Sequence, residues 1–191
     1  MELQRINVKV SLADWQVSPD EIFKVFNQWI STDTEEVLID VADYRHVHNG
    51  PETLLVGHYA NYCIDNSDGS IGLLYSHKRG LQGTLAQRIE AVFAAALKAC
   101  ARLEAQPEIS GRVRFDASKV VFTVNDRLLA PNNESVRGQI RAELDPYLER
   151  LFGGTDYDVM ADENAGNRTS FRARSTTAGT VAAALENVGA G

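Results

Sequence analysis

The sequence has little cysteine and no long run of apolar residues. Its two cysteines, Cys63 and Cys100, show no CxxC spacing and no cluster of partner ligands, which argues against a disulfide framework. The sequence has no run of about 18 apolar residues. Its first 20 residues also lack the continuous apolar segment of a signal peptide. We therefore expect a cytoplasmic protein with no membrane partner.

An excess of basic residues is also missing. The 191 residues include 19 Lys and Arg against 26 Asp and Glu, a formal net charge of -7. Affinity for nucleic acid comes largely from neutralising phosphates, so this balance argues against nucleic acid as a partner. Apolar residues at 44% and charged residues at 24% are ordinary for a folded globular chain of this length.

Two capping boxes predict where helices begin. Ser18 can accept a hydrogen bond from the N–H of Glu21, and the Glu21 carboxylate can reach back to the N–H of Ser18. Pro19 suits the first helical position. Thr84 and Gln87 repeat the box. Apolar residues at helical spacing follow both boxes and predict helices that run to about residue 31 and about residue 105.

Short or alternating apolar runs predict strands around these helices. We expect strands at residues 5–10, 37–41, 53–58, 60–65, 71–76, 112–116, 120–124, 157–160 and 168–174, and a third helix after residue 132. The segments 112–116 and 120–124 are expected to form a hairpin. The order βαββββα-ββαββ predicts one α+β domain over 1–175, with two or three helices packed on a mostly antiparallel sheet. Residues 176–191 are expected to form a short C-terminal helix or a flexible tail.

A candidate metal site follows the apolar run at 37–41. Imidazole and carboxylate ligands must converge on a divalent metal, and His46 and His48 can place two rings on one side of an extended segment. Asp43 and His58 could complete the set. A metal-dependent hydrolase built from residues 40–58 is therefore the alternative function. The stretch lacks HExxH or any other mechanism-bearing spacing, and an exposed His-x-His is commonly just solvated.

A candidate anion site lies in the connection before the second helix. Glycines let backbone N–H groups turn toward an anion, a helix start supplies unpaired N–H donors, and basic side chains add charge. The residues concerned are Lys78, Arg79, Gly80, Gly83 and Thr84. The lysine precedes the glycines, so this is not the P-loop order, and basic residues at a strand exit are usually solvated.

Arginines alternate along two of the expected strands. If these strands were neighbours, five guanidinium groups would share one face and could bind RNA or an acidic partner; solvated arginines paired with aspartates are the plainer interpretation. They are Arg112, Arg114, Arg168, Arg172 and Arg174. In the loop 125–132, Leu128 and Leu129 are expected to pack inward and anchor the loop.

The sequence carries no GxSxG, P-loop or other motif tied to a mechanism, so no catalytic residue is assigned. We expect a non-enzymatic α+β module with no cofactor that binds a small anionic ligand or a protein partner. The small side chains of Ala91, Ala94, Ala95 and Ala99 lie along the back of the second predicted helix. They predict either core packing or, together with the C-terminal segment, the contact of a homo-oligomer.

Overall fold

The computed structural model describes residues 1–47, 51–177 and 179–189. These described residues form one eight-stranded antiparallel sheet, four α-helices and a short 3-10 helix, which confirms the predicted α+β class. The elements are β1 (Ile6–Trp15), α1 (Pro19–Thr32), β2 (Leu38–Asp43), β3 (Pro51–Gly57), β4 (Ala60–Asp65), β5 (Gly72–His77), α2 (Leu85–Glu104), a short 3-10 helix (Pro107–Ile109), β6 (Val113–Val124), α3 (Glu134–Phe152), β7 (Tyr157–Ala161), β8 (Ser170–Ser175) and α4 (Val181–Asn187).

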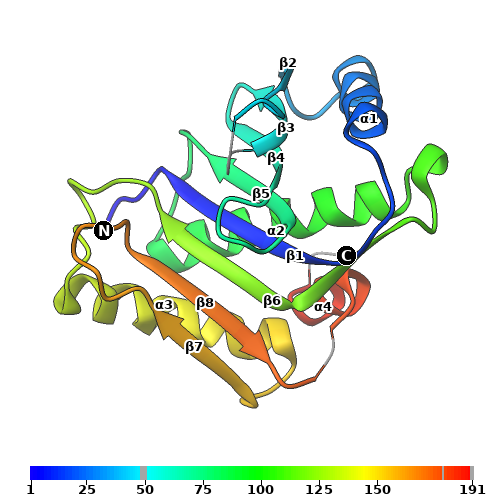
Figure 1. Cartoon of the computed structure of the whole chain (residues 1–191). Coiled ribbons are helices and arrows are strands. Elements are labelled where there is room, and N and C mark those ends of the chain that lie inside the picture. Colours follow the sequence, from blue (N-terminus) through cyan, green and yellow to red (C-terminus); the bar gives the residue numbers. More distant parts are fainter. Residues whose placement is uncertain (48–50, 178, 190–191) are drawn as a thin grey trace.

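The helices pack on one face of the sheet, and its opposite face is open. The strands lie in the order β2-β3-β4-β5-β1-β6-β8-β7. Helix α2 packs on β5, β1 and β6, and α1 packs on β2 and β3. Helices α3 and α4 pack against α2, and Figure 1 shows α2 and α3 behind the sheet. The face turned toward the viewer in Figure 1 carries no helix from the described residues.

The central strand β1 is buried on both faces of the sheet. Ile6, Val8 and Val10 point to the helical side and belong to the main core. Successive side chains of a strand alternate between faces, so Asn7 and Lys9 point to the open side. Both are nevertheless buried. The open face therefore contains sites where polar side chains are shielded from water.

Both predicted capping boxes are present. The Ser18 Oγ accepts from the N–H of Glu21, and the Glu21 carboxylate accepts from the N–H of Ser18 at 2.9 Å. Thr84 and Gln87 form the same pair of bonds at the start of α2. These bonds satisfy N–H groups that the first helical turn leaves free.

The hairpin expected from residues 112–124 is wrong, because these residues form the single long strand β6. The register against β1 shifts at Ser11, which pairs with Asp116, whereas Val10 pairs with Val120. In the extra residues between these pairs, the Asp116 carboxylate accepts from the N–H of Ser118 at 3.1 Å. The turn-forming residues thus make a bulge inside one strand, and the pairing continues on both sides of it.

The C-terminal segment folds back onto the helical layer. Helix α4 packs on α2, α3 and β6, with Val181 and Ala184 buried. In the part of the chain that the structure describes, no helix combines the length and apolar character needed to cross a membrane.

Candidate functional site

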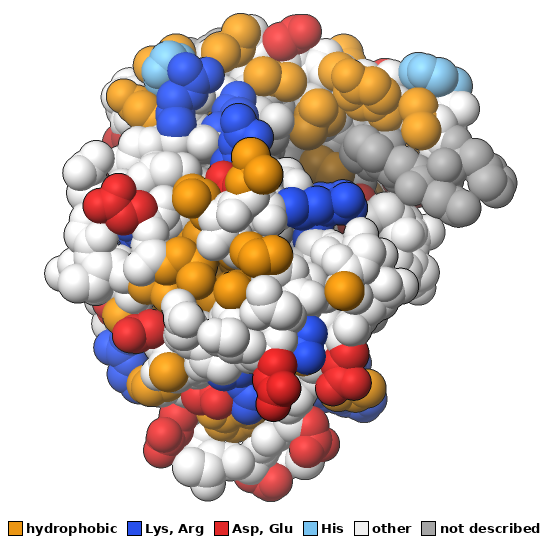
Figure 2. Space-filling view, turned by 90° about the vertical axis from the view of Figure 1, so that its left-hand side faces the viewer, with side chains coloured by type: hydrophobic (Ala, Val, Ile, Leu, Met, Phe, Trp, Pro, Cys, Tyr) orange, Lys and Arg blue, Asp and Glu red, His pale blue; other side chains and the backbone are white. Residues whose placement is uncertain are grey.

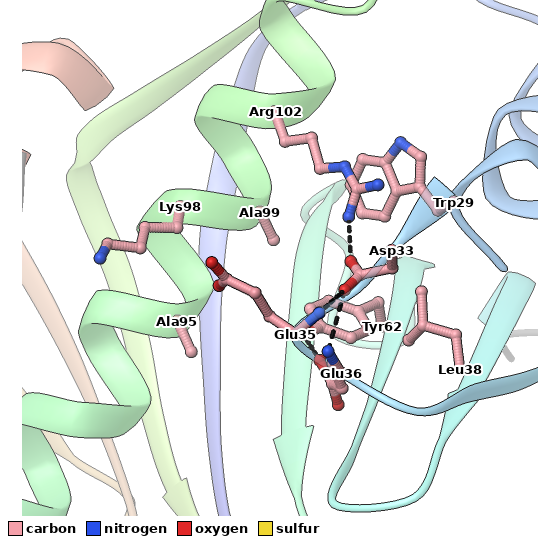
Figure 3. A pocket seen from close by; sticks show the side chains of 10 residues that line it. All are labelled: Trp29, Asp33, Glu35, Glu36, Leu38, Tyr62, Ala95, Lys98, Ala99 and Arg102. Atoms are coloured by element: carbon pink, nitrogen blue, oxygen red, sulfur yellow. Dashed lines mark hydrogen bonds and ion pairs between the residues drawn. The ribbon is translucent and has the colours of Figure 1, made fainter. Parts of the chain in front are cut away.

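A cleft of about 370 Å³ lies between the end of α1, the start of β2 and one side of α2 (Figure 3). Ligand sites of small molecules usually measure about 300–1,000 Å³, so this cleft has the size of one. Its walls combine apolar and charged side chains from four elements and one loop. The lining residues are Trp29, Asp33, Glu35, Glu36, Leu38, Tyr62, Ala95, Lys98, Ala99 and Arg102.

The loop after α1 is held by its first residue. Asp33 caps the end of α1 through its backbone N–H. One oxygen of its carboxylate, Oδ1, accepts from the N–H of Glu35 at 3.0 Å and from the N–H of Glu36 at 2.9 Å. This turn directs the two glutamates to the cleft, and in Figure 3 Glu35 extends from the loop toward α2.

One wall of the cleft is braced by a charge pair. The Arg102 Nη1 lies 2.5 Å from the second oxygen of Asp33, and its guanidinium lies 4.1 Å from the centre of the Trp29 ring. Burial alone would raise the pKa of Asp33, but the N–H groups of Glu36 and Glu35 and the Arg102 guanidinium outweigh burial and lower it. Asp33 therefore stays charged and balances Arg102, so this pair adds no net charge to the cleft.

The side of the cleft that α2 forms also carries two small side chains. Ala95, Lys98, Ala99 and Arg102 follow the i, i+3, i+4, i+7 spacing of one helix face. The two alanines leave open the space that larger side chains would fill. Two of the four alanines that suggested close helix packing thus line the cleft.

The lining of the cleft includes a half-buried carboxyl group, that of Glu36. The Tyr62 hydroxyl donates a short hydrogen bond to Oε2 of Glu36. The other oxygen, Oε1, is buried and has no hydrogen-bond partner among the described residues. Burial, together with the nearby Asp33 carboxylate, raises the pKa of Glu36 more than the Tyr62 hydroxyl, Lys78 and the backbone N–H of Ala60 lower it. Burial and the Glu36 carboxylate likewise raise the pKa of Tyr62. A ligand that brings a donor or a positive charge would therefore relieve an unfavourable burial.

Replacing Glu36 with glutamine is expected to raise the free energy of unfolding at pH 7 and to change it little at pH 4. The folded-state pKa of Glu36 lies above the ordinary value of 4.5, so this group costs stability as the pH rises through the raised pKa. Glutamine carries no charge and avoids that cost. Urea unfolding of Glu36→Gln at both pH values measures the difference, with Glu35→Gln as the exposed control. An equal change at the two pH values would contradict the assignment.

The residues of the predicted anion site lie along one connection, but several of their groups are already bonded. The Lys78 Nζ donates to the Gly57 carbonyl, and the Thr84 N–H donates to Gln87 at 2.8 Å. Gly80 and Gly83 have positive φ angles of 92° and 83°, a backbone conformation that glycine adopts without strain. Arg79 is exposed. An anion site at these five positions stays a prediction.

The residues of the predicted metal site are spread along a hairpin. Asp43 pairs with Thr53 at one end of the β2-β3 pair, whereas His58 follows the other end of β3. From Thr53 to Gly57 the strand advances by four residues at ~3.3 Å each, so the two ends of the β2-β3 pair lie roughly 13 Å apart. Asp43 is bonded to Arg45 at 2.8 Å, and His46 stacks on Tyr44.

His48 lies outside the described residues, so the full predicted set is not placed. Within the described ranges, no three His, Cys, Asp or Glu side chains come close enough together to hold a metal ion.

The five arginines do not share one patch. Arg112 and Arg114 lie at the start of β6, and Arg112 pairs with Glu21 at 2.6 Å. Strand β8 pairs with the other end of β6, where Arg172 lies opposite Val121. The inward packing expected of the loop leucines is also wrong, because Leu128 is 94% exposed and Leu129 is 53% exposed. The turn around Asp126, which accepts from both their N–H groups, holds the loop instead.

The cleft was missed at the sequence level, although two of its signals are visible there. One is the acidic run Asp33-Thr34-Glu35-Glu36 directly after a helix, and the other is the helical spacing of small and basic residues from 95 to 102. Their meeting depends on the packing of α1 and α2 on the same sheet face. No model of a known protein family and no curated protein sequence matches this chain.

Proposed function

We propose that this protein is a non-enzymatic binding module that holds a small organic ligand with an apolar body and an amino group in the cleft between α1 and α2. The observation that carries the proposal is the half-buried Glu36 carboxyl group, which lines a ligand-sized cleft and has one buried oxygen without a hydrogen-bond partner among the described residues. Pockets that combine apolar walls with a few convergent polar groups are the usual form of ligand sites.

The charges of the lining favour a cationic group on the ligand. Asp33 and Arg102 offset each other, which leaves Glu35 and Glu36 against Lys98. An ammonium group beside Glu36 would restore the solvation that this carboxyl loses by burial. The ring of Tyr62 and the side chain of Leu38 supply apolar contact for the rest of the ligand.

Binding, rather than covalent catalysis, fits the side chains that are present. The ten described residues of the cleft include no serine, threonine, cysteine or histidine. The hydroxyl, thiol and imidazole groups of the serine, threonine and cysteine enzymes are therefore absent from the described lining.

Benzylamine is a suitable probe, and benzoate is its control with the same ring and opposite charge. Benzylamine is expected to shift the NMR signal of the Trp29 indole N–H and to bind at least about tenfold more tightly than benzoate, since a charge-assisted hydrogen bond is worth more than one decade in affinity. Ala95→Leu should abolish this shift by filling the cleft.

The matched control is Ala91→Leu, one turn earlier on the exposed side of α2 and outside the cleft. It adds the same side chain and should leave benzylamine binding unchanged. Equal affinities for benzylamine and benzoate, or unchanged binding in Ala95→Leu, would overturn the proposal.

A protein partner, a homo-oligomer and a cytoplasmic location also stay proposals. The exposed Leu128 and Leu129 support a protein contact at their loop. Exposed Ala91 leaves part of α2 open to a second copy of the chain, although α4 covers another part. Cys63 and Cys100 are free and buried, which supports a reducing compartment.

A further inference from the structure

The open face of the sheet holds a second pocket, of about 190 Å³, on the side opposite the helices. Its side chains come from β1, β5, β6 and β8, from the end of β4, and from the turn between β4 and β5. In Figure 2 this face is turned to the right-hand side and is seen edge-on. The pocket is separate from the cleft at Glu36 and shares no lining residue with it.

A chain of ion pairs forms one side of the pocket. The buried Lys9 Nζ lies 2.8 Å from Asp65 and 2.6 Å from Asp68. Asp68 also lies 2.8 Å from the Arg172 Nη1, so the turn between β4 and β5 reaches across to β8. The charges of Lys9 and Arg172 balance those of Asp65 and Asp68. Only the Arg172 Nη1 donates within this chain of ion pairs, so the other guanidinium N–H groups can bind a ligand.

A further cation on the same rim is not balanced. Arg168, Ser170 and Arg172 alternate along the chain and line the pocket together. Arg168 donates to the Asn125 side-chain oxygen at 3.3 Å and has no carboxylate within ion-pair distance among the described residues. The pocket therefore has one positive charge more than its own carboxylates neutralise, and this excess favours an anion.

The floor of the pocket contains an unsatisfied amide. Asn7 is 7% exposed and lines the pocket, and its Oδ1 is buried without a hydrogen-bond partner in the described chain. Asn7 pairs across the sheet with Thr123, which pairs with Ser170, and the two hydroxyl oxygens lie 2.8 Å apart. A buried amide oxygen without a partner is unfavourable unless a ligand or a bound molecule bonds to it.

We propose that this pocket binds a small hydroxylated anion, whose carboxylate or phosphate group pairs with Arg168 and Arg172 and whose hydroxyl group bonds to the Asn7 amide. The volume of 190 Å³ holds about six non-hydrogen atoms, at ~30 Å³ each as for liquid water. A three-carbon hydroxycarboxylate has this size. The excess positive charge attracts the anionic group, and the Asn7 amide selects for the hydroxyl.

Titration by NMR with L-lactate, propionate and hydroxymethylphosphonate tests the site, because each of these anions has five or six non-hydrogen atoms. L-lactate is expected to shift the backbone amide signals of Thr123 and Ser170, and propionate, which lacks the hydroxyl, to bind more weakly. Tighter binding of hydroxymethylphosphonate than of L-lactate would identify a phosphate-like anionic group as the preferred one, and the reverse order would identify the hydroxycarboxylates. The proposal is overturned if no probe moves these two signals at millimolar concentration.

Three variants separate a built site from general attraction to positive charge. Arg168→Ala should weaken L-lactate binding at least about tenfold, because it removes a charge-assisted bond. Arg174→Ala removes the same charge from β8, six residues further along the chain and outside the pocket, and should leave binding unchanged. Asn7→Ala should abolish the preference for L-lactate over propionate.

Equal losses in Arg168→Ala and Arg174→Ala would contradict the proposal, as would an unchanged preference in Asn7→Ala. Ala95→Leu, which fills the other cleft, should not affect this titration. The two sites therefore succeed or fail independently.

Discussion

Replacing Trp29 with alanine is expected to lower the free energy of unfolding by about 3–5 kcal/mol. Trp29 is 2% exposed and lies where α1, α2 and the sheet meet. Its ring lies 5.4 Å from that of Phe26 and 6.3 Å from that of Tyr62, and Arg102 stacks on it. Alanine would lose these contacts and leave a cavity that the rigid surroundings cannot close. Urea unfolding measures the change.

Ser18→Ala is the comparison for this variant. It removes one cap bond at the exposed start of the same helix and should cost about 1 kcal/mol. The difference between the two variants separates packing of α1 on the core from formation of the helix itself. A loss in Trp29→Ala as small as that in Ser18→Ala would contradict the packing of α1 described above.

Replacing Lys9 with methionine is expected to cost about 3–5 kcal/mol at pH 7, because it leaves the buried Asp65 carboxylate without its cation. Lys9 is 3% exposed and Asp65 is 4% exposed. Methionine keeps most of the chain length of lysine, so the loss reports on charge more than on volume. Arg172→Met is the control, since Arg172 is more than half exposed and should cost only about 0–1 kcal/mol.

The loss in Lys9→Met should shrink as the pH falls below 4. Burial would raise the pKa of Asp68, but hydrogen bonds from Lys9 and Ser70 outweigh burial and hold that pKa well below its usual value of 3.8. A depressed pKa adds stability that is present above the ordinary pKa and is lost as the pH falls toward the folded-state value. The wild type therefore loses the stability contributed by ionised Asp68 in acid. Lys9→Met lacks the Lys9 hydrogen bond to Asp68, so it loses less stability over the same pH range. Unfolding midpoints of both proteins from pH 7 to pH 3 test this, and a constant difference would contradict it.

Helix starts could be predicted because they depend on neighbouring residues. Ser18 with Glu21, and Thr84 with Gln87, bond within one helical turn, so the sequence alone contains both partners. The strands expected at residues 60–65 and 71–76 likewise followed from short apolar runs, and they form β4 and β5. Such local signals were enough for the α+β class.

Strand β6 shows where local signals fail. Residues 116–119 are typical of a turn, and the side chain of Asp116 does bond to Ser118 as in one. The chain nevertheless continues along β1, because the apolar residues on both sides of the bulge belong to the same core. The choice between turn and bulge thus depends on a distant strand.

The two pockets depend on distant contacts even more strongly. Lys9 and Asp68 are 59 positions apart, and Asp33 and Arg102 are 69 apart. Lys9 alternates with apolar residues and is typical of a solvent-exposed position, until the turn between β4 and β5 folds over it. Asp43 and His58 are close in sequence but are not brought together. Asp43 ends β2 and His58 follows β3, and because these two strands are antiparallel, the two residues lie at opposite ends of the hairpin.

A crystal structure of the protein grown with benzylamine tests the proposed function most directly. We expect electron density for benzylamine in the cleft between α1 and α2, with its amino group within hydrogen-bond distance of the Glu36 carboxyl group and its ring against Tyr62. An unoccupied cleft, or a bound benzylamine whose amino group points away from Glu36, would contradict it.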